Sequence, residues 1–222
     1  MKKNLSQDKN IIIRRSLRYK NLRLKIAPSG QVLLNLPFFC SKTQAYSFLE
    51  KHHDWIIEHQ QKQAQRLVFS TDMKLSLLGQ DLQIHHIPNE RGHTHIHKDR
   101  LLVFGDEHFI HRRVQDFIKK QTALYIDEKA RELATRLGVK INKITMKDTT
   151  SRWGSCSGKN NLNFCWRLGL APLYVLDYII AHEVAHLREM NHGPQFWKIV
   201  SEIDDNRASA EIWLRRNGHT LR

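Results

Sequence analysis

The first third of the chain alternates β-like runs with one amphipathic helix. Hydrophobic residues recur at a period of two between residues 11 and 26, and a second apolar run occupies residues 32–37. A Pro-Ser-Gly turn at residues 28–30 separates the two runs, so we predict a β-hairpin. Ser41 is the candidate N-cap of a charged amphipathic helix that extends to about residue 66.

Short β-like segments return between residues 75 and 103, with turn residues at Gly79, Pro88-Asn89 and Gly105. Residues 108–137 predict a long helix that Gly138 closes at its C-terminal end. The elements predicted after it are a strand at 140–148, a loop and strand at 151–170, and helices near 172–190, 194–204 and 207–217.

The composition is that of a globular protein with a strongly basic surface. The 222 residues include 36 Lys+Arg and 22 Asp+Glu, a formal net charge of +14, and 41% are hydrophobic, which excludes a disordered or collagen-like chain. The segment from Arg14 to Lys25 is rich in cations without an acid between them, so it can attract a nucleotide or nucleic acid. The alternative is a solvated strand face, because only Tyr19 offers a ring there for base stacking.

The sequence favours a cytoplasmic protein that does not enter a membrane. It has no apolar run near the roughly 20 residues that span a bilayer. The first eight residues lack the apolar segment of a signal peptide. The three cysteines, Cys40, Cys156 and Cys165, form no CxxC pair and suit a reducing compartment.

Two groups of histidines are candidate metal sites. In the first, His93, His95 and His97 alternate with other residues, so a strand would carry all three imidazoles on one face about 7 Å apart. That arrangement provides neither a closed tetrahedral pocket nor a nearby base. We expect a solvent-exposed strand there.

The second group is the H-E-x-x-H sequence from His182 to His186, which lies in an almost wholly apolar segment and therefore on a buried helix. Residues four apart share a helix face, so both imidazoles can meet one Zn²⁺, and Glu183 can reach a water beside it. The alternative, two core histidines and a surface carboxylate, would leave buried polar groups without partners. The motif therefore predicts a zinc hydrolase.

A catalytic zinc site normally has three protein ligands, and His192 is the best candidate for the third. Asn191 tolerates a left-handed turn that would end the helix, and the Gly193-Pro194 pair suits the start of the next one. Glu189 and His219 are weaker alternatives, because the first lies further along the same helix and the second lies in a tail.

Three motifs together resemble the YgjP-like metallopeptidase-domain proteins, relatives of the WLM and SprT-like zincins. These motifs are the segment 146–156, which contains Trp-Gly-Ser-Cys, the segment 162–168, and the histidine motifs up to residue 197. The resemblance implies an α+β fold with a zincin-like catalytic domain, an N-terminal region rich in β-hairpins, and long helices. It implies that His182, His186 and His192 bind zinc and that Glu183 is the acid/base residue. We expect a β-rich region at 1–105 and the metal-hydrolase domain at 106–222, with its core motifs at 146–197.

The expected reaction is hydrolysis of a peptide or protein substrate by a zinc-activated water, with Glu183 as the general base. The candidates for stabilising the oxyanion are Arg152, Asn163 and Tyr178, which the sequence does not rank. The strand at 162–168 is either an edge that aligns an extended substrate or an ordinary core strand.

Two further residues near the motifs have alternative roles. Cys156 is either a nucleophile activated by a histidine or, as we favour, a packing residue beneath the zinc helix. Asp177 either holds a ligand imidazole or pairs with a surface base.

The basic charge keeps two other functions open. One is metal-dependent hydrolysis of the phosphoanhydride bonds of nucleoside triphosphates, because anions suit a basic cleft. The other is a DNA-associated protease, which the SprT-like resemblance also suggests and which would show salt-dependent DNA binding.

Overall fold

The computed structural model describes residues 11–26, 31–64, 67–149 and 151–221. The chain divides into two compact units, Met1–Arg66 and Leu67–Arg222. This division differs from the predicted boundary between residues 105 and 106. The reason is that strands of the segment 74–104 share one hydrophobic core with the long helix that follows them, so they belong to the second unit.

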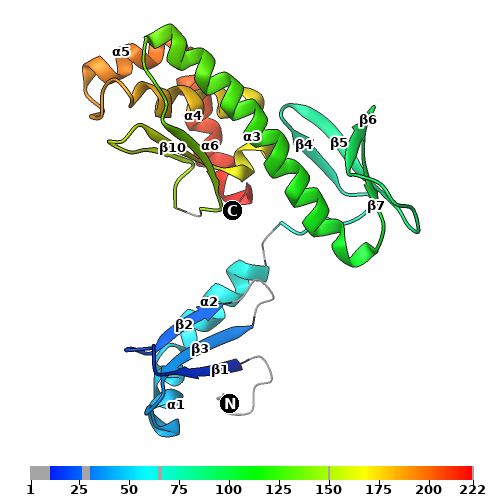
Figure 1. The fold of residues 1–222 in the computed structure, drawn as a ribbon, viewed down its shortest axis with the longest axis vertical. Helices are drawn as coiled ribbons and strands as arrows, with labels where there is room; N and C mark the ends of the chain where they lie inside the picture. The colour runs from blue at the N-terminus through cyan, green and yellow to red at the C-terminus, as the bar shows by residue number, and fades with distance from the viewer. Residues whose placement is uncertain (1–10, 27–30, 65–66, 150, 222) are drawn as a thin grey trace. The chain divides into compact units, whose positions relative to one another are not determined.

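The first unit contains a three-stranded sheet and two helices (Figure 1). The strands β1 (Ile11–Ser16), β3 (Val32–Pro37) and β2 (Arg23–Ile26) lie side by side in that order. Strands β2 and β3 are antiparallel, as the hairpin prediction requires, and the predicted turn at 28–30 lies outside the described residues. The prediction missed that β1 runs parallel to β3 along its other edge.

The predicted helix beginning at Ser41 is present as two helices, α1 (Lys42–Lys51) and α2 (His53–Ala64). Ser41 is the N-cap, because its side chain accepts the Gln44 N–H while the Gln44 side chain accepts the Ser41 N–H. The continuous helix is wrong at His52, where the backbone leaves helical geometry and the ring Nδ1 donates to the Phe48 carbonyl at 2.8 Å. The buried core of this unit comprises Val32, Leu34, Leu36, Cys40, Ala45, Leu49 and Ile56.

The second unit begins with a four-stranded sheet. Its order is β4 (Lys74–Leu77), β5 (Gln80–Ile87), β7 (Arg100–Phe104) and β6 (His95–His97). The predicted turns are present, because Gly79, Asn89 and Gly105 all have positive φ angles. His95 and His97 are exposed on β6, in agreement with a solvent-exposed strand.

Helix α3 (Ile110–Leu137) crosses the second unit (Figure 1). Its buried side chains recur every three or four residues, which is the pattern of one apolar stripe. It ends as predicted at Gly138, which adopts the left-handed conformation with φ 67°.

A second sheet of three strands follows, in the order β8 (Lys143–Lys147), β10 (Asn161–Cys165) and β9 (Gly154–Cys156). Strand β10 runs parallel to β8 and antiparallel to β9, so it is paired on both sides. The edge-strand alternative for residues 162–168 is therefore wrong, and the core-strand alternative holds. The chain then enters a 3₁₀ turn, Trp166–Leu170.

Three helices complete the unit: α4 (Leu173–Ala185), α5 (Pro194–Ile203) and α6 (Arg207–Asn217). Helix α4 is buried, as predicted, and contacts α3, α5, α6 and β9. None of the described helices combines the length and the apolarity needed to cross a membrane. This mixture of helices with separate, partly antiparallel sheets is an α+β fold.

Candidate metal centre

Helix α4 carries two imidazoles and a carboxylate at its C-terminal end. His182 and Glu183 lie in its last turn, and His186 is its C-cap residue. His182 and His186 are four residues apart and therefore share a face of the helix, with ring centroids separated by 5.0 Å. A buried helix thus holds both side chains in a defined orientation.

His192 approaches these two residues from the segment between α4 and α5. Its Nε2 lies 3.1 Å from Nε2 of His182, and its ring centroid lies 4.7 Å from that of His186. Nitrogens of all three lie within 4.8 Å of one another. Two nitrogens bound tetrahedrally to one zinc ion are about 3.3 Å apart. Among the residues that the structure describes, this is the one group of His, Cys, Asp or Glu side chains placed to hold a metal ion.

Neighbouring groups orient the three rings. His186 Nδ1 donates a hydrogen bond to the carbonyl oxygen of Glu189 at 3.1 Å, which leaves Nε2 of that ring for a metal ion. The ring of Phe196 lies 4.4 Å from that of His186, and the ring of Trp197 stacks on His192 at 5.7 Å. Both aromatic residues belong to α5, so this helix supports the imidazoles from one side.

Burial favours the neutral form of His182 and His186. It lowers the pKa of His182 to about 4, and the neighbouring imidazoles act in the same direction. Burial also lowers the pKa of His186. A metal ion binds neutral imidazole, so these two side chains do not have to lose a proton at neutral pH to become ligands.

Glu183 directly follows His182 on α4 and is only 6% exposed. Burial raises the pKa of its carboxyl group to about 7, although the positive charge of Arg152 opposes the shift. Gly154 of strand β9 makes room for this side chain, since a Cβ at residue 154 would lie 2.5 Å from Glu183 Oε1. Gly154 lies within the Trp-Gly-Ser-Cys segment, where no sequence pattern indicated this contact.

The turn that delivers His192 differs from the expected one. Helix α4 ends at Ala185 rather than near residue 190, and Asn191 is not among the described residues with positive φ. Asn191 instead donates its N–H to Glu189 Oε1 at 3.0 Å, and Gly193 is the N-cap of α5 with φ −76°. The position of Pro194 in the first turn of α5 agrees with the expectation.

The two alternative third ligands lie outside the imidazole group. The carboxylate of Glu189 accepts the hydrogen bond from the Asn191 backbone. His219 is exposed in the short 3₁₀ turn Gly218–Leu221 after α6. Of the three candidates, the structure brings only His192 together with His182 and His186.

Comparison with protein families identifies the chain. The model of the family described as "YgjP-like, metallopeptidase domain" matches residues 20–217. The chain belongs to this family. The match confirms the resemblance inferred from the sequence and assigns a metallopeptidase domain, and hence a hydrolase, to the chain. It extends across both compact units.

Two solved structures are similar to this YgjP-like chain over part of its length. The metallopeptidase zymogen of Pyrococcus abyssi abylysin is 20% identical, with a TM-score of 0.36, covering 42% of this chain and 92% of that one. The metallopeptidase zymogen of Methanocaldococcus jannaschii jannalysin is 24% identical, with a TM-score of 0.34, covering 40% of this chain and 85% of that one. The comparison with curated proteins found no match.

The three oxyanion candidates of this YgjP-like protein occupy different places. Arg152 and Asn163 line one pocket beside β9. Tyr178 is buried on α4, with its ring 6.0 Å from that of His182, and its hydroxyl donates to Glu211 Oε1 at 2.9 Å. Its hydroxyl hydrogen is therefore already used within the fold.

Helix α6 supports the centre through residues that the sequence analysis missed. Arg207 donates to the same Glu211 oxygen at 3.0 Å, and its guanidinium lies 3.3 Å from the ring centroid of Trp197. Arg207, Trp197 and His192 thus form a stack that ends at an imidazole. An Arg-Glu pair four residues apart is common on exposed helices, so the sequence carried no signal of this role.

The surroundings of Asp177 and Cys156 favour structural roles for both residues. Asp177 accepts a hydrogen bond from Tyr125 at 2.6 Å, which links α4 to α3, so neither alternative proposed for Asp177 is observed. Burial and the charge of Glu183 raise the pKa of Cys156 to about 11. A thiol with so high a pKa is a poor nucleophile at neutral pH, which favours the packing role.

We expect Tyr178→Phe to change peptide hydrolysis by less than about threefold and to lower the free energy of unfolding by about 1 kcal/mol. The variant loses a hydrogen bond to Glu211 and no group aimed at a substrate. Steady-state kinetics and urea unfolding measure the two effects. A loss of kcat near the 10²-fold typical of an oxyanion donor would instead assign the hydroxyl to the reaction.

Gly154→Ala is expected to lower kcat by about 10–100-fold, because the added methyl group would displace the Glu183 carboxylate. Metal content should stay unchanged, since the three atoms nearest to the added Cβ all belong to Glu183 and not to a histidine. Gly158→Ala is the matched control, because a Cβ there meets nothing within 4 Å. Equal activity of the two variants would show that Glu183 tolerates displacement.

Proposed function

We propose that the chain is a zinc-dependent peptidase in which His182, His186 and His192 hold the ion and Glu183 is the general base. The convergence of three imidazoles beside a buried carboxylate carries this proposal. Three imidazoles, with no thiolate among them, fit the ligand preference of a catalytic zinc site. The metallopeptidase family match supports the same reading.

When bound, the ion supplies Lewis-acid chemistry that activates water and polarises a peptide carbonyl. Glu183 accepts a proton from the attacking water and returns it to the nitrogen of the leaving amine. Burial keeps the pKa of Glu183 near 7, which lets one carboxyl group serve as base and then as acid. The space at Gly154 allows this side chain to stay beside the imidazoles.

Digestion of a peptide library by the full-length protein, read by mass spectrometry, tests this function. We expect cleavage that stops after chelation and returns when zinc is restored. Release of phosphate or pyrophosphate from a nucleotide panel, without peptide cleavage, would overturn the proposal and favour the phosphoanhydride alternative. The nucleotide alternative otherwise remains a prediction from charge, and the DNA alternative remains a prediction from charge and from the SprT-like resemblance.

Strand β9 is the edge along which we propose that an extended substrate binds. The carbonyl oxygen of Trp153 accepts a hydrogen bond from the strand β10, and the N–H of Ser157 donates one to it. Because the backbone groups of successive residues in a strand point to opposite sides, those of Gly154 and Cys156 point away from β10, towards the free edge. The Gly154 end of this edge lies beside Glu183. A peptide added here would form backbone hydrogen bonds next to the reacting groups.

N-methylation of one substrate amide that pairs with β9 is therefore expected to raise KM by about 2–10-fold, with a smaller effect on kcat. A scan of single N-methyl groups along a cleaved peptide measures this. The sensitive positions should alternate, because every second amide of an added strand faces β9. A uniform response along the peptide would contradict alignment on this edge.

We also place the protein in the cytoplasm. All three cysteines are free thiols, which suits a reducing compartment.

A further inference from the structure

A polar pocket of about 300 Å³ lies against β9 and β10, next to the metal centre. Gly154, which touches Glu183 on one side, also lines this pocket. Its polar lining includes Lys147, Arg152, Ser155 and Asn163. The pocket is therefore adjacent to the proposed reaction site without containing any of the three imidazoles.

The pocket residues Ser155 and Asn163 lie on the face of the sheet opposite α4. They are cross-strand partners, and Asn163 Nδ2 donates to Ser155 Oγ at 3.3 Å. Leu162 and Phe164, which precede and follow Asn163, are buried in the core. Side chains alternate between the two faces of a strand, so Asn163 and Ser155 face away from that core.

The pocket is positively charged and rich in hydrogen-bond donors. Lys147 and Arg152 are both exposed, and none of the described residues that line the pocket is acidic. Asp148 follows Lys147 in the chain, but its carboxylate pairs with the buried Arg167. Ser155 accepts the bond from Asn163 and so keeps its own hydroxyl hydrogen for a ligand. A carboxylate, which only accepts hydrogen bonds, complements such a lining.

Resting on the proposed function, we infer that this pocket is a specificity subsite for an acidic side chain of the peptide substrate. A substrate strand paired with β9 would place the side chain opposite Ser155 on the same face as Ser155. That face opens into the pocket with Lys147 and Arg152. Lys147, Arg152 and Asn163 then bind the carboxylate of the substrate side chain.

The test measures binding in a protein that does not cleave. Zinc-loaded Glu183→Gln protein is titrated calorimetrically with variants of a peptide that the wild-type protein cleaves, carrying Glu, Gln or Lys at each position in turn. At one position near the cleaved bond we expect Glu to bind about tenfold more tightly than Gln, and Lys more weakly than Gln.

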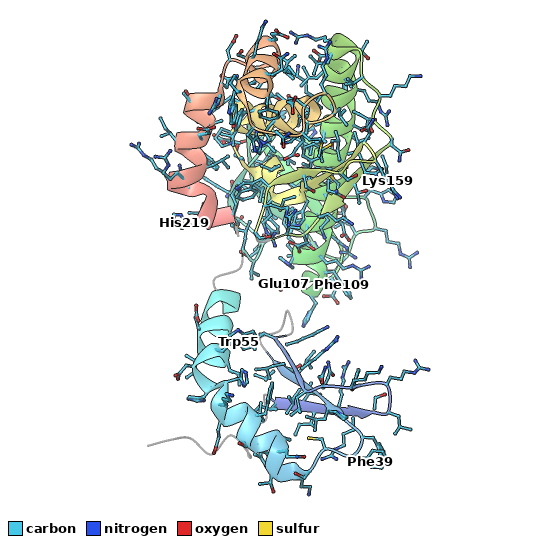
Figure 2. The ribbon with its side chains drawn as sticks, turned by 90° about the vertical axis from the view of Figure 1, so that its left-hand side faces the viewer. Phe39, Trp55, Glu107, Phe109, Lys159 and His219 are labelled. Atoms are coloured by element: carbon cyan, nitrogen blue, oxygen red, sulfur yellow. The ribbon has the colours of Figure 1, made fainter. Side chains whose placement is uncertain are left out.

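Reversing the charge of a pocket residue tests whether the preference for Glu arises in this pocket. In the same background, Lys147→Glu should abolish the preference for Glu and improve binding of the Lys peptide, while affinity for the Gln peptide stays within about twofold. Lys159→Glu is the control, because Lys159, which Figure 2 labels, lies in the turn between β9 and β10 and is not among the residues that line the pocket. If Lys147→Glu and Lys159→Glu changed the preference for the Glu peptide equally, the preference would come from the overall surface charge, and the subsite proposal would be overturned.

The outcomes separate the two proposals. Cleavage by the wild-type protein without any preference between Glu, Gln and Lys overturns the subsite and leaves the peptidase intact. Absence of both cleavage and binding for every peptide overturns the peptidase proposal, and the subsite falls with it.

Discussion

Glu183→Gln is expected to lower the rate of peptide hydrolysis by about 10²–10⁴-fold while the protein keeps its metal ion. Glutamine has nearly the same size as glutamate and fits the space beside Gly154, but its amide does not accept a proton from water. Kinetics on a cleaved peptide, together with metal analysis of the purified protein, measures the two quantities separately.

The matched control is Glu202→Gln, which changes an exposed carboxylate on α5. It should leave kcat/KM unchanged. If zinc-loaded Glu183→Gln kept peptidase activity within tenfold of wild type, Glu183 would not be the general base. Loss of metal in that variant would instead show that the carboxylate holds the ion rather than moving a proton.

His192→Ala is expected to abolish hydrolysis and to lower zinc affinity by more than about 10–100-fold. That range is the typical loss when a residue that only orients a metal ligand is mutated, and His192→Ala removes a ligand itself. Two imidazoles on α4 would remain, and a site with two protein ligands holds zinc weakly. His192 is exposed, so its removal leaves no core cavity and the variant should fold. Zinc titration followed by competition with a chelator measures the affinity.

Thermal unfolding supplies a readout of this site that does not depend on catalysis. An ion that binds the folded state raises Tm with zinc concentration, and His192→Ala should lose most of that rise. His219→Ala is the matched control, because His219 is exposed and lies outside the imidazole group. An unchanged zinc dependence in His192→Ala would show that the third ligand is another residue.

Local sequence determined the candidate ligand set and most of the helices. Because the helical repeat places residues four apart on one face, His182 and His186 converge on any helix that carries them. Ser41 and Gly138 mark helix ends through caps formed within a few residues. His192 was predicted from its neighbours Gly193 and Pro194, although the left-handed turn expected at Asn191 is absent.

The tertiary structure alone decided which strand is the free edge and what surrounds the carboxylate. The sequence indicates strands near β1 and β10 but places β9 in a segment predicted only as a loop and a strand. The pairing of β1 with β3 and of β10 with β8 joins segments that are separated in the chain and is selected by packing. The space for Glu183 at Gly154 and the bond from Tyr178 to Glu211 likewise join residues about 30 positions apart. Such contacts depend on how whole helices and strands pack against one another, so a local sequence pattern does not predict them.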